Sequence, residues 1–298
     1  MPVLVLLGRS ACTASKDRKQ DQCAHVQGVG ARFSGSKVGA LAKAFGKPAD
    51  DRTVFCGSCG PSPHPVRGEP SMRMRINTLL DTAKIPNNGG ELRFFQRDNE
   101  YTIEVVGIGG DLMTTAVHGS EDSLAELAIK RIADKSKARI LVGGLGMGFT
   151  LAAALKDIGA RGQVVVAELV PEVVKWNQGP MGERSGNPML DPRAVVRVED
   201  VAGVIREKRD AYDAILLDTD NGPVGLTQPA NSRIYSLTGL YAAFAALRPK
   251  GVLAVWSTDP DRPFTKRLEK VGFKVEEVKV FAHRDKGTKH HLWFATRP

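Results

Sequence analysis

The stretch Ile140-Leu-Val-Gly-Gly-Leu-Gly-Met-Gly148 decides the fold class of this 298-residue chain. An apolar run typical of a buried strand leads into a glycine-rich turn. A helical segment begins at Phe149, and the next apolar run, Val164–Ala167, is followed by Glu168. Backbone N–H groups at such a turn approach a ligand closely, and a carboxylate one strand further on can accept hydrogen bonds from a ribose. This order predicts a nucleoside-containing ligand.

The spacing of the glycines narrows the choice of ligand. They read Gly144-x-Gly146-x-Gly148, so the G-x-G-x-x-G pattern of dinucleotide-binding enzymes would need a glycine where Phe149 stands. We therefore expect Gly144, Gly146 and Gly148 to bind a sulfonium nucleoside such as S-adenosylmethionine rather than NAD. A tight strand-to-helix connection that binds nothing is the alternative for this turn.

Strand and helix patterns alternate along the rest of the chain. Apolar strands are expected near 139–143, 163–168, 194–198, 213–218, 251–256, 273–280 and 289–296, and helices near 149–158, 171–178, 200–207, 233–247 and 262–270. Such alternation predicts a parallel sheet covered by helices on both faces. The last two strands are joined by a turn, Arg284–Gly287, that is too short for a parallel crossover. We predict an α/β fold, with a Rossmann-like, seven-stranded, mostly parallel sheet that ends in an antiparallel hairpin.

The segment before this fold has a different pattern. Three alternating runs, Glu91–Arg97, Tyr101–Val106 and Leu112–Val117, are separated by short polar or glycine turns. They predict a small antiparallel β-meander. We place the meander domain at residues 72–118 and the nucleotide-binding domain at residues 119–298.

Residues 1–71 are basic, with 10 Lys and Arg against 5 Asp and Glu, and lack sustained periodicity. We expect either a disordered extension or a non-native segment, with translation beginning at Met72 or Met74. All four cysteines of the chain lie here, at Cys12, Cys23, Cys56 and Cys59. The ten residues between the first two fit no common zinc pairing, so we expect no metal site.

Composition excludes several other classes of protein. The apolar fraction of 42% and charged fraction of 25% are those of a globular protein. No apolar run approaches the roughly 18 residues of a membrane span, and the N-terminal pattern is not that of a secretory signal. Beyond residue 71 the chain has 32 basic against 28 acidic residues, which gives no strong case for nucleic acid. We expect a cytoplasmic protein.

Acidic residues gather where strands end. Glu168, Asp200, Asp218 and Asp220 follow the second, third and fourth strands of the predicted sheet, and ligands of open α/β sheets lie beyond these ends. Glu168 can accept both ribose hydroxyls, and Asp200 can accept from the adenine amine, although a helix N-cap is the alternative for Asp200. Carboxylates also attract a sulfonium. Asp218 can take the proton of an acceptor amine, which is mostly protonated at neutral pH.

These segments resemble those of the spermidine synthases, the polyamine aminopropyltransferases. The resemblance is carried by Leu141–Gly148, by the pair Glu168 and Asp200, by Ile215-Leu-Leu-Asp-Thr-Asp-Asn-Gly-Pro223 and by Arg233-Ile-Tyr-Ser236. It covers roughly residues 90–280, including the meander. The resemblance implies a class I methyltransferase-like fold that binds an adenosyl sulfonium.

The resemblance also implies roles for single residues. Glu168 would bind the ribose and Asp200 the adenine, together with the glycine turn. Asp218 would be the catalytic base, with Asp220 beside it in the same segment, and Tyr235 would lie near the acceptor.

The chain departs from the family pattern in three places. The family carries an Asp inside the glycine turn that pairs with the amine of decarboxylated S-adenosylmethionine, and this chain has Gly146 there. The second Asp of the family's Asp-Ser-Ser-Asp pattern falls on Asn221, although Asp220 is adjacent. The Tyr-His-Glu or Tyr-Gln-Glu element is reduced to Val117-His-Gly119, with Glu121 nearby.

We therefore expect a spermidine-synthase-like transferase that alkylates a small-molecule amine. Gly146 and Asn221 favour methyl transfer from S-adenosylmethionine, which we place slightly ahead of aminopropyl transfer. Aminopropyl transfer from decarboxylated S-adenosylmethionine is the alternative that the resemblance favours. An NAD-dependent oxidoreductase and a non-catalytic nucleotide-binding module are the alternatives from other classes, and a homodimer is compatible with the sequence.

Overall fold

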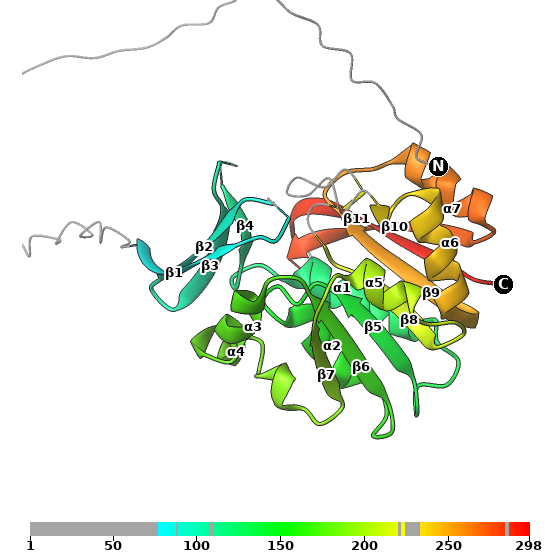
Figure 1. Ribbon diagram of the computed structural model, residues 1–298, viewed down its shortest axis with the longest axis horizontal. Coiled ribbons are helices and arrows are strands. Elements are labelled where there is room, and N and C mark those ends of the chain that lie inside the picture. Colours follow the sequence, from blue (N-terminus) through cyan, green and yellow to red (C-terminus); the bar gives the residue numbers. More distant parts are fainter. Residues whose placement is uncertain (1–76, 88, 108–109, 220–221, 224–232, 284–285) are drawn as a thin grey trace, which may run out of the picture. The chain divides into compact units, whose positions relative to one another are not determined.

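The computed structural model describes residues 77–87, 89–107, 110–219, 222–223, 233–283 and 286–298. All of them belong to one compact unit, Gly68–Pro298. This unit contains a four-stranded antiparallel sheet and a seven-stranded mixed sheet with helices (Figure 1). The predicted fold class is therefore confirmed. Among the described residues, no helix combines the length and the apolar character that crossing a membrane requires.

The smaller sheet has the strand order β1-β2-β3-β4. Its strands are β1 (Asn77–Lys84), β2 (Glu91–Arg97), β3 (Glu100–Val105) and β4 (Asp111–Thr114). The sequence predicted only three strands, and the missing one is β1. Seven of its eight residues are exposed, so it carries no alternation of apolar and polar residues for a pattern search to find. Its place is set by antiparallel pairing with β2.

The larger sheet has the strand order β10-β11-β9-β8-β5-β6-β7. Its strands are β5 (Arg139–Gly143), β6 (Gln163–Glu168), β7 (Ala194–Val198), β8 (Tyr212–Leu217), β9 (Leu247–Ser257), β10 (Lys274–His283) and β11 (Lys286–Thr296). Strands β5 to β9 run parallel, and β11 is antiparallel to both β9 and β10. The short turn between the last two strands forces this arrangement, as the sequence predicted.

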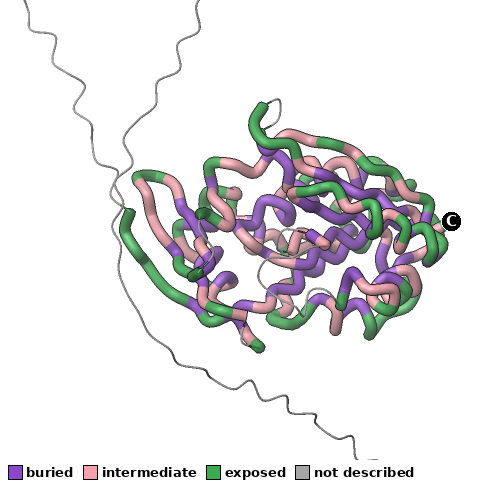
Figure 2. Tube along the Cα trace, turned by 90° about the horizontal axis from the view of Figure 1, so that it is seen from above, coloured by how far each residue is buried: buried purple, intermediate pink, exposed green. Residues whose placement is uncertain are grey.

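Helices connect the strands of this sheet. They are α1 (Gly119–Lys130), α2 (Phe149–Asp157), α3 (Pro171–Asn177), α4 (Pro180–Arg184), the 3₁₀ helix η1 (Pro188–Leu190), α5 (Val201–Arg206), α6 (Leu237–Ala246) and α7 (Arg262–Val271). Alternate residues of each strand face opposite layers, since successive side chains of a strand point to opposite sides. Ile140 and Val142 pack in the core that contains α1 and α2, whereas Leu141 packs with α5, α6 and α7. Buried residues concentrate in this interior (Figure 2).

Helix α3 ties the two sheets together. The ring of Trp176 stacks on Phe94 of β2 at a centroid distance of 4.8 Å. Its Nε1 donates a hydrogen bond of 2.8 Å to Asp81 of β1. This bond, together with the backbone N–H of Thr82, holds the pKa of Asp81 below its usual value. The contact positions the meander beside the glycine turn, so both sheets can line one cavity.

Ile103, fully buried in β3, tests whether the meander belongs to the cooperative core. We expect Ile103→Ala to lower the free energy of unfolding by about 2 to 5 kcal/mol, because it removes buried methylene groups and leaves a cavity. Urea denaturation measures the change. Leu79→Ala is the control in the same sheet, since Leu79 is 49% exposed and should change stability by less than about 0.5 kcal/mol. Equal effects of the two substitutions would contradict this packing.

Candidate functional site

The glycine turn after β5 adopts backbone geometry that other residues resist. Gly144 and Gly148 have φ angles of 89° and 85°, in the left-handed region that favours glycine. A Cβ on Gly144 would lie 2.5 Å from the carbonyl oxygen of Asp218, and one on Gly148 would lie 2.8 Å from the Ser185 hydroxyl oxygen. The turn therefore packs directly against the end of β8, and Gly148 begins helix α2.

Glu168 is the last residue of β6 and is only 7% exposed. Its Oε2 accepts a hydrogen bond of 2.8 Å from the backbone N–H of Leu145, and its Oε1 accepts one of 2.8 Å from Val170. Burial raises the pKa of this carboxyl group, and the backbone donors oppose that rise. These donors include the backbone N–H groups of Gly146 and Leu169, so the carboxyl group is fixed at the edge of the glycine turn. Its predicted contact with ribose remains a prediction.

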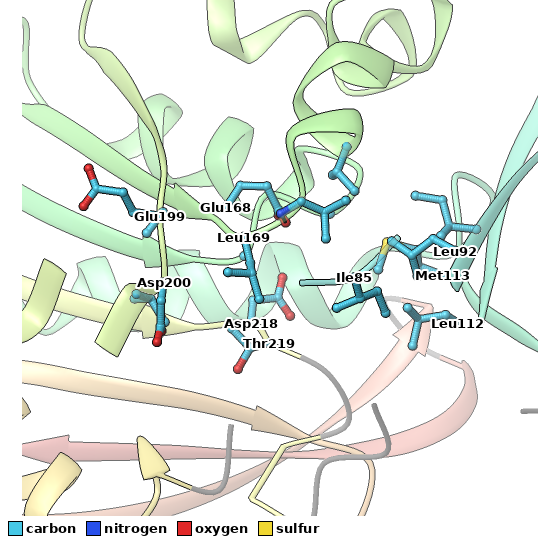
Figure 3. Close-up of a pocket in the computed structure, with 17 residues that line it drawn as sticks. Ile85, Leu92, Leu112, Met113, Glu168, Leu169, Glu199, Asp200, Asp218 and Thr219 are labelled. Carbon is cyan, nitrogen blue, oxygen red and sulfur yellow. Dashed lines mark hydrogen bonds between the residues drawn. The ribbon is translucent and has the colours of Figure 1, made fainter. Parts of the chain in front are cut away.

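The first cavity lies beyond the ends of β5, β6 and β8, where ligands of open α/β sheets bind. Apolar side chains of the meander region line one side, and acidic side chains lie among apolar ones on the side of the larger sheet (Figure 3). The lining includes Ile85, Leu92, Leu112, Met113, Gly144, Gly146, Glu168, Leu169, Glu199, Asp200, Asp218 and Thr219.

Asp200 lines this cavity and also caps helix α5. Its Oδ1 accepts a hydrogen bond of 2.8 Å from the backbone N–H of Ala202. The helix N-cap, which the sequence analysis gave as the alternative role of Asp200, is therefore observed. A contact with adenine remains a prediction, which the position of Asp200 at the cavity allows.

The second cavity, of about 620 Å³, adjoins the first. The two share four lining residues, which are Leu112, Met113, Gly146 and Asp218. The walls of the second cavity also include Glu121 of α1, Thr150 of α2 and Trp256 of β9. Asp218 therefore lines both cavities, and the second cavity holds a further carboxyl group, that of Glu121.

Asp218 and Glu121 form an electrostatically coupled pair of carboxyl groups. Burial raises the pKa of Asp218 to about 6, and a hydrogen bond of 2.5 Å from the Thr150 hydroxyl opposes this rise. Burial, followed by the charge of Asp218, raises the pKa of Glu121 to about 7. Two neighbouring carboxylates resist double ionisation, so the pair favours one shared proton near neutral pH or a cation between them.

The sequence analysis did not name Glu121 as a site residue. Glu121 lies in the first turn of α1, where an acidic residue usually only complements the helix dipole. The one available signal was its position two residues beyond the segment that replaces the family's Tyr-His-Glu element.

Tyr235 is not among the residues that line the two cavities, and its predicted place near the acceptor remains a prediction. It is 2% exposed, and its hydroxyl lies 2.9 Å from the Thr219 hydroxyl. Its ring packs edge-on against Phe264, because an aromatic side chain gains more from burial in this core than from a solvated wall. Asp220, predicted beside the base, lies outside the described residues.

No protein-family model matches the chain. Among solved structures, a spermidine synthase in complex with the transition-state analogue AdoDATO superposes with a TM-score of 0.59 and 19% identity, over 74% of this chain and 73% of that one. The spermidine synthase of Thermotoga maritima gives a TM-score of 0.58 and 19% identity, over 75% of this chain and 72% of that one. This chain has the spermidine synthase fold. At this identity the similarity shows the fold alone. The roles of individual residues in this chain therefore rest on the geometry of its own site.

The glycine turn gives a prediction about packing. We expect Gly144→Ala to destabilise the protein and to abolish binding in the first cavity, because its Cβ would collide with the Asp218 carbonyl. Gly186→Ala is the matched control, since Gly186 also has a positive φ of 79° but open space around its Cβ position. Both substitutions carry the backbone cost of about 1 kcal/mol. Thermal unfolding should therefore show a clearly larger loss of stability for Gly144→Ala than for Gly186→Ala. Similar losses would mean that the close approach is unimportant.

The carboxyl pair gives a prediction about pH. Because the pKa of Glu121 is raised from 4.5 to about 7, the unfolded chain releases this proton at lower pH than the folded protein. The contribution of this carboxyl group to the stability of the folded protein is therefore favourable at low pH and is lost as pH rises to about 7. Between pH 5 and pH 8, we expect the stability of Glu121→Gln relative to wild type to increase by roughly 1 to 3 kcal/mol.

Urea denaturation at both pH values measures this difference. Glu126→Gln, on the same helix, is the control and should keep a constant difference from wild type. If the wild type and Glu121→Gln depend on pH in parallel, the carboxyl pair is not coupled.

Proposed function

We propose that this protein transfers an alkyl group from an adenosyl sulfonium donor to a small-molecule amine, with aminopropyl transfer from decarboxylated S-adenosylmethionine as the first candidate. The observation that carries the proposal is the meeting of two cavities at Asp218 and Gly146. A transferase needs one space for the donor and one for the acceptor, with the reacting atoms at their junction.

The first cavity suits the donor. The glycine turn lines this cavity and packs closely against Asp218. Because its glycines have no side chains, the backbone of the turn is open to a ligand. Glu168 is held in place by two backbone N–H groups, which fixes its carboxylate for a pair of ribose hydroxyls. The sulfonium of the donor carries a fixed positive charge, and the carboxylates of the cavity stabilise that charge by Coulomb attraction.

The second cavity suits an amine that arrives as an ammonium ion. Its positive charge compensates the Asp218 and Glu121 pair, which otherwise favours a shared proton. The amine reacts only when neutral, so its N–H proton passes to the Asp218 carboxylate. The nitrogen lone pair then attacks the carbon beside sulfur, the carbon–sulfur bond breaks, and the thioether leaves with the electron pair. A base with a pKa of about 6 accepts this proton and releases it again at neutral pH.

The identity of the donor rests on two observations that point in opposite directions. A spermidine synthase of the same fold binds the transition-state analogue AdoDATO, which supports decarboxylated S-adenosylmethionine. Methyl transfer from S-adenosylmethionine, placed first from the sequence, is the second candidate. It is favoured by Met113, whose sulfur lies 3.4 Å from a Cβ built on Gly146. A thioether therefore occupies the space above the turn, where the resemblance would place an aspartate for the donor amine.

A panel of ligands tests the proposal and separates the two donors. Calorimetric titration with S-adenosylmethionine, its decarboxylated form, methylthioadenosine and NAD measures binding in the first cavity. Incubation of each donor with aliphatic diamines, followed by mass analysis of the products, measures transfer. Aminopropylated product with the decarboxylated donor supports the first candidate, and methylated product with the intact donor supports the second. Preferential binding of NAD, or nucleoside binding without any transfer, refutes the proposal.

Asp218→Asn should lower the rate of transfer by about 10²- to 10⁴-fold, because the amide cannot accept the amine proton. Donor affinity should change only a few-fold, since the amide keeps the shape of the side chain. Steady-state kinetics and donor titration measure the two effects. Asp157→Asn, at the opposite end of α2 from the glycine turn, is the control for loss of one carboxylate. Unchanged turnover of Asp218→Asn would remove this residue from the mechanism.

A further inference from the structure

We propose that Glu121, Ser120 and His290 form a proton relay that carries the proton taken up by Asp218 out of the second cavity. This inference rests on the proposed function. The relay begins in the second cavity, passes through the first turn of α1 and ends on strand β11.

The proposed reaction needs such an exit. An ammonium acceptor and a sulfonium donor give an alkylated ammonium and a neutral thioether, so each turnover releases one proton. That proton is first bound to Asp218, whose carboxylate must be regenerated before the next acceptor can react. Asp218 stands between two cavities that the donor and acceptor fill, so its proton needs a path that the ligands do not block.

The hydrogen bonds of the relay are continuous from Glu121 to His290. The Ser120 hydroxyl donates to Glu121 Oε2 over 2.6 Å, and the same hydroxyl oxygen lies 2.9 Å from His290 Nδ1. Ser120 is almost completely buried, so its hydroxyl serves these two partners instead of solvent. The step from Asp218 to Glu121 crosses the second cavity, which both side chains line and which a water molecule can bridge.

The surroundings hold His290 against the same cavity. Its ring packs edge-on against Trp256 at a centroid distance of 4.7 Å, and Trp256 is part of the cavity wall. The imidazole is half-buried, so one side of it faces the protein and the other can reach solvent. A proton that arrives at Nδ1 can therefore leave from Nε2.

Proton transfer along the relay balances at every atom. When Glu121 is protonated, its O–H donates to the Ser120 oxygen, and the Ser120 hydrogen points at the free Nδ1 of His290. As the Glu121 proton moves to Ser120, the Ser120 hydrogen moves to His290, so the hydroxyl is regenerated in the same step. Glu121 becomes a carboxylate that accepts from Ser120, and His290 becomes an imidazolium that releases a proton from Nε2. This release leaves the proton on Nδ1, and a change of tautomer through solvent returns it to Nε2 before the next transfer.

The surroundings shift the pKa at both ends of the relay. Burial, followed by the charges of Asp218 and of Asp122, the next residue of α1, raises the pKa of Glu121, which lets it take a proton from Asp218. Burial and the neighbouring His291 of β11 lower the pKa of His290, while Asp259, after β9, raises it. His291 is itself bound to Glu277 of β10 at 2.7 Å. Transfer from Glu121 to a weakly basic His290 is uphill, and the loss of the His290 proton to solvent draws it forward.

Chemical rescue tests the relay on the whole protein. We expect His290→Ala to lower kcat by about 10- to 100-fold with kcat/KM nearly unchanged, since proton release after transfer is slowed and the steps up to transfer are not. Imidazole added to the buffer should restore this variant, because it can occupy the vacated space beside Ser120. Ser120→Ala should lose activity to a similar extent, and imidazole should not restore it, because the hydroxyl link is missing. The double variant should be no slower than either single variant.

His283→Ala is the control, since His283 is an exposed residue that pairs with Lys286 beside the turn of the same hairpin and should keep wild-type kinetics. Restoration by imidazole also shows that the His290→Ala protein is folded. If His290→Ala turns over at the wild-type rate, or if imidazole restores both variants equally, the relay is refuted and the proposed function stands. If the wild type transfers no group from either sulfonium donor, the proposed function fails and the relay fails with it.

Discussion

The site depends on one close contact, the packing of the turn after β5 against the end of β8. Gly144 donates its N–H to the carbonyl of Ala167 at 2.9 Å, and Asp218 donates its N–H to the carbonyl of Gly143 at 3.0 Å. A side chain on Gly144 would collide with the backbone of Asp218. This contact brings the ends of three parallel strands together, so that Glu168 and Asp218 border one cavity without any side chain filling the space between them.

The second requirement is a wall opposite the strand ends, and the meander supplies it. Apolar residues of this sheet join one face of the larger fold in a single core, with Trp176 as the connecting side chain. Met113 of β4 then lies beside Gly146 and lines both cavities. The meander is therefore part of the site, because it closes a cleft that an isolated nucleotide-binding fold would leave open to solvent.

Much of this architecture could be predicted from the sequence, and the failures have physical causes. The buried parallel strands could be predicted because they are continuous apolar runs in the sequence. The turn could be predicted because its positive φ angles favour glycine. Strand β1 was missed because its side chains are exposed, so its position is fixed by backbone pairing that leaves no pattern. Glu121 was missed as a site residue because its coupling to Asp218 arises from tertiary packing. For Tyr235 the family resemblance specifies a residue type without the depth at which it is buried, so its burial could not be predicted.

The positions of the tryptophans have a spectroscopic consequence. Trp293 is completely enclosed and Trp176 is fixed against Phe94, whereas Trp256 faces a cavity and contacts an imidazole. Indole fluorescence responds to local polarity and is quenched more strongly by imidazolium than by neutral imidazole. With Trp176 and Trp293 replaced by phenylalanine, the emission of Trp256 would report ligand binding in the second cavity and the ionisation of His290, without any attached dye.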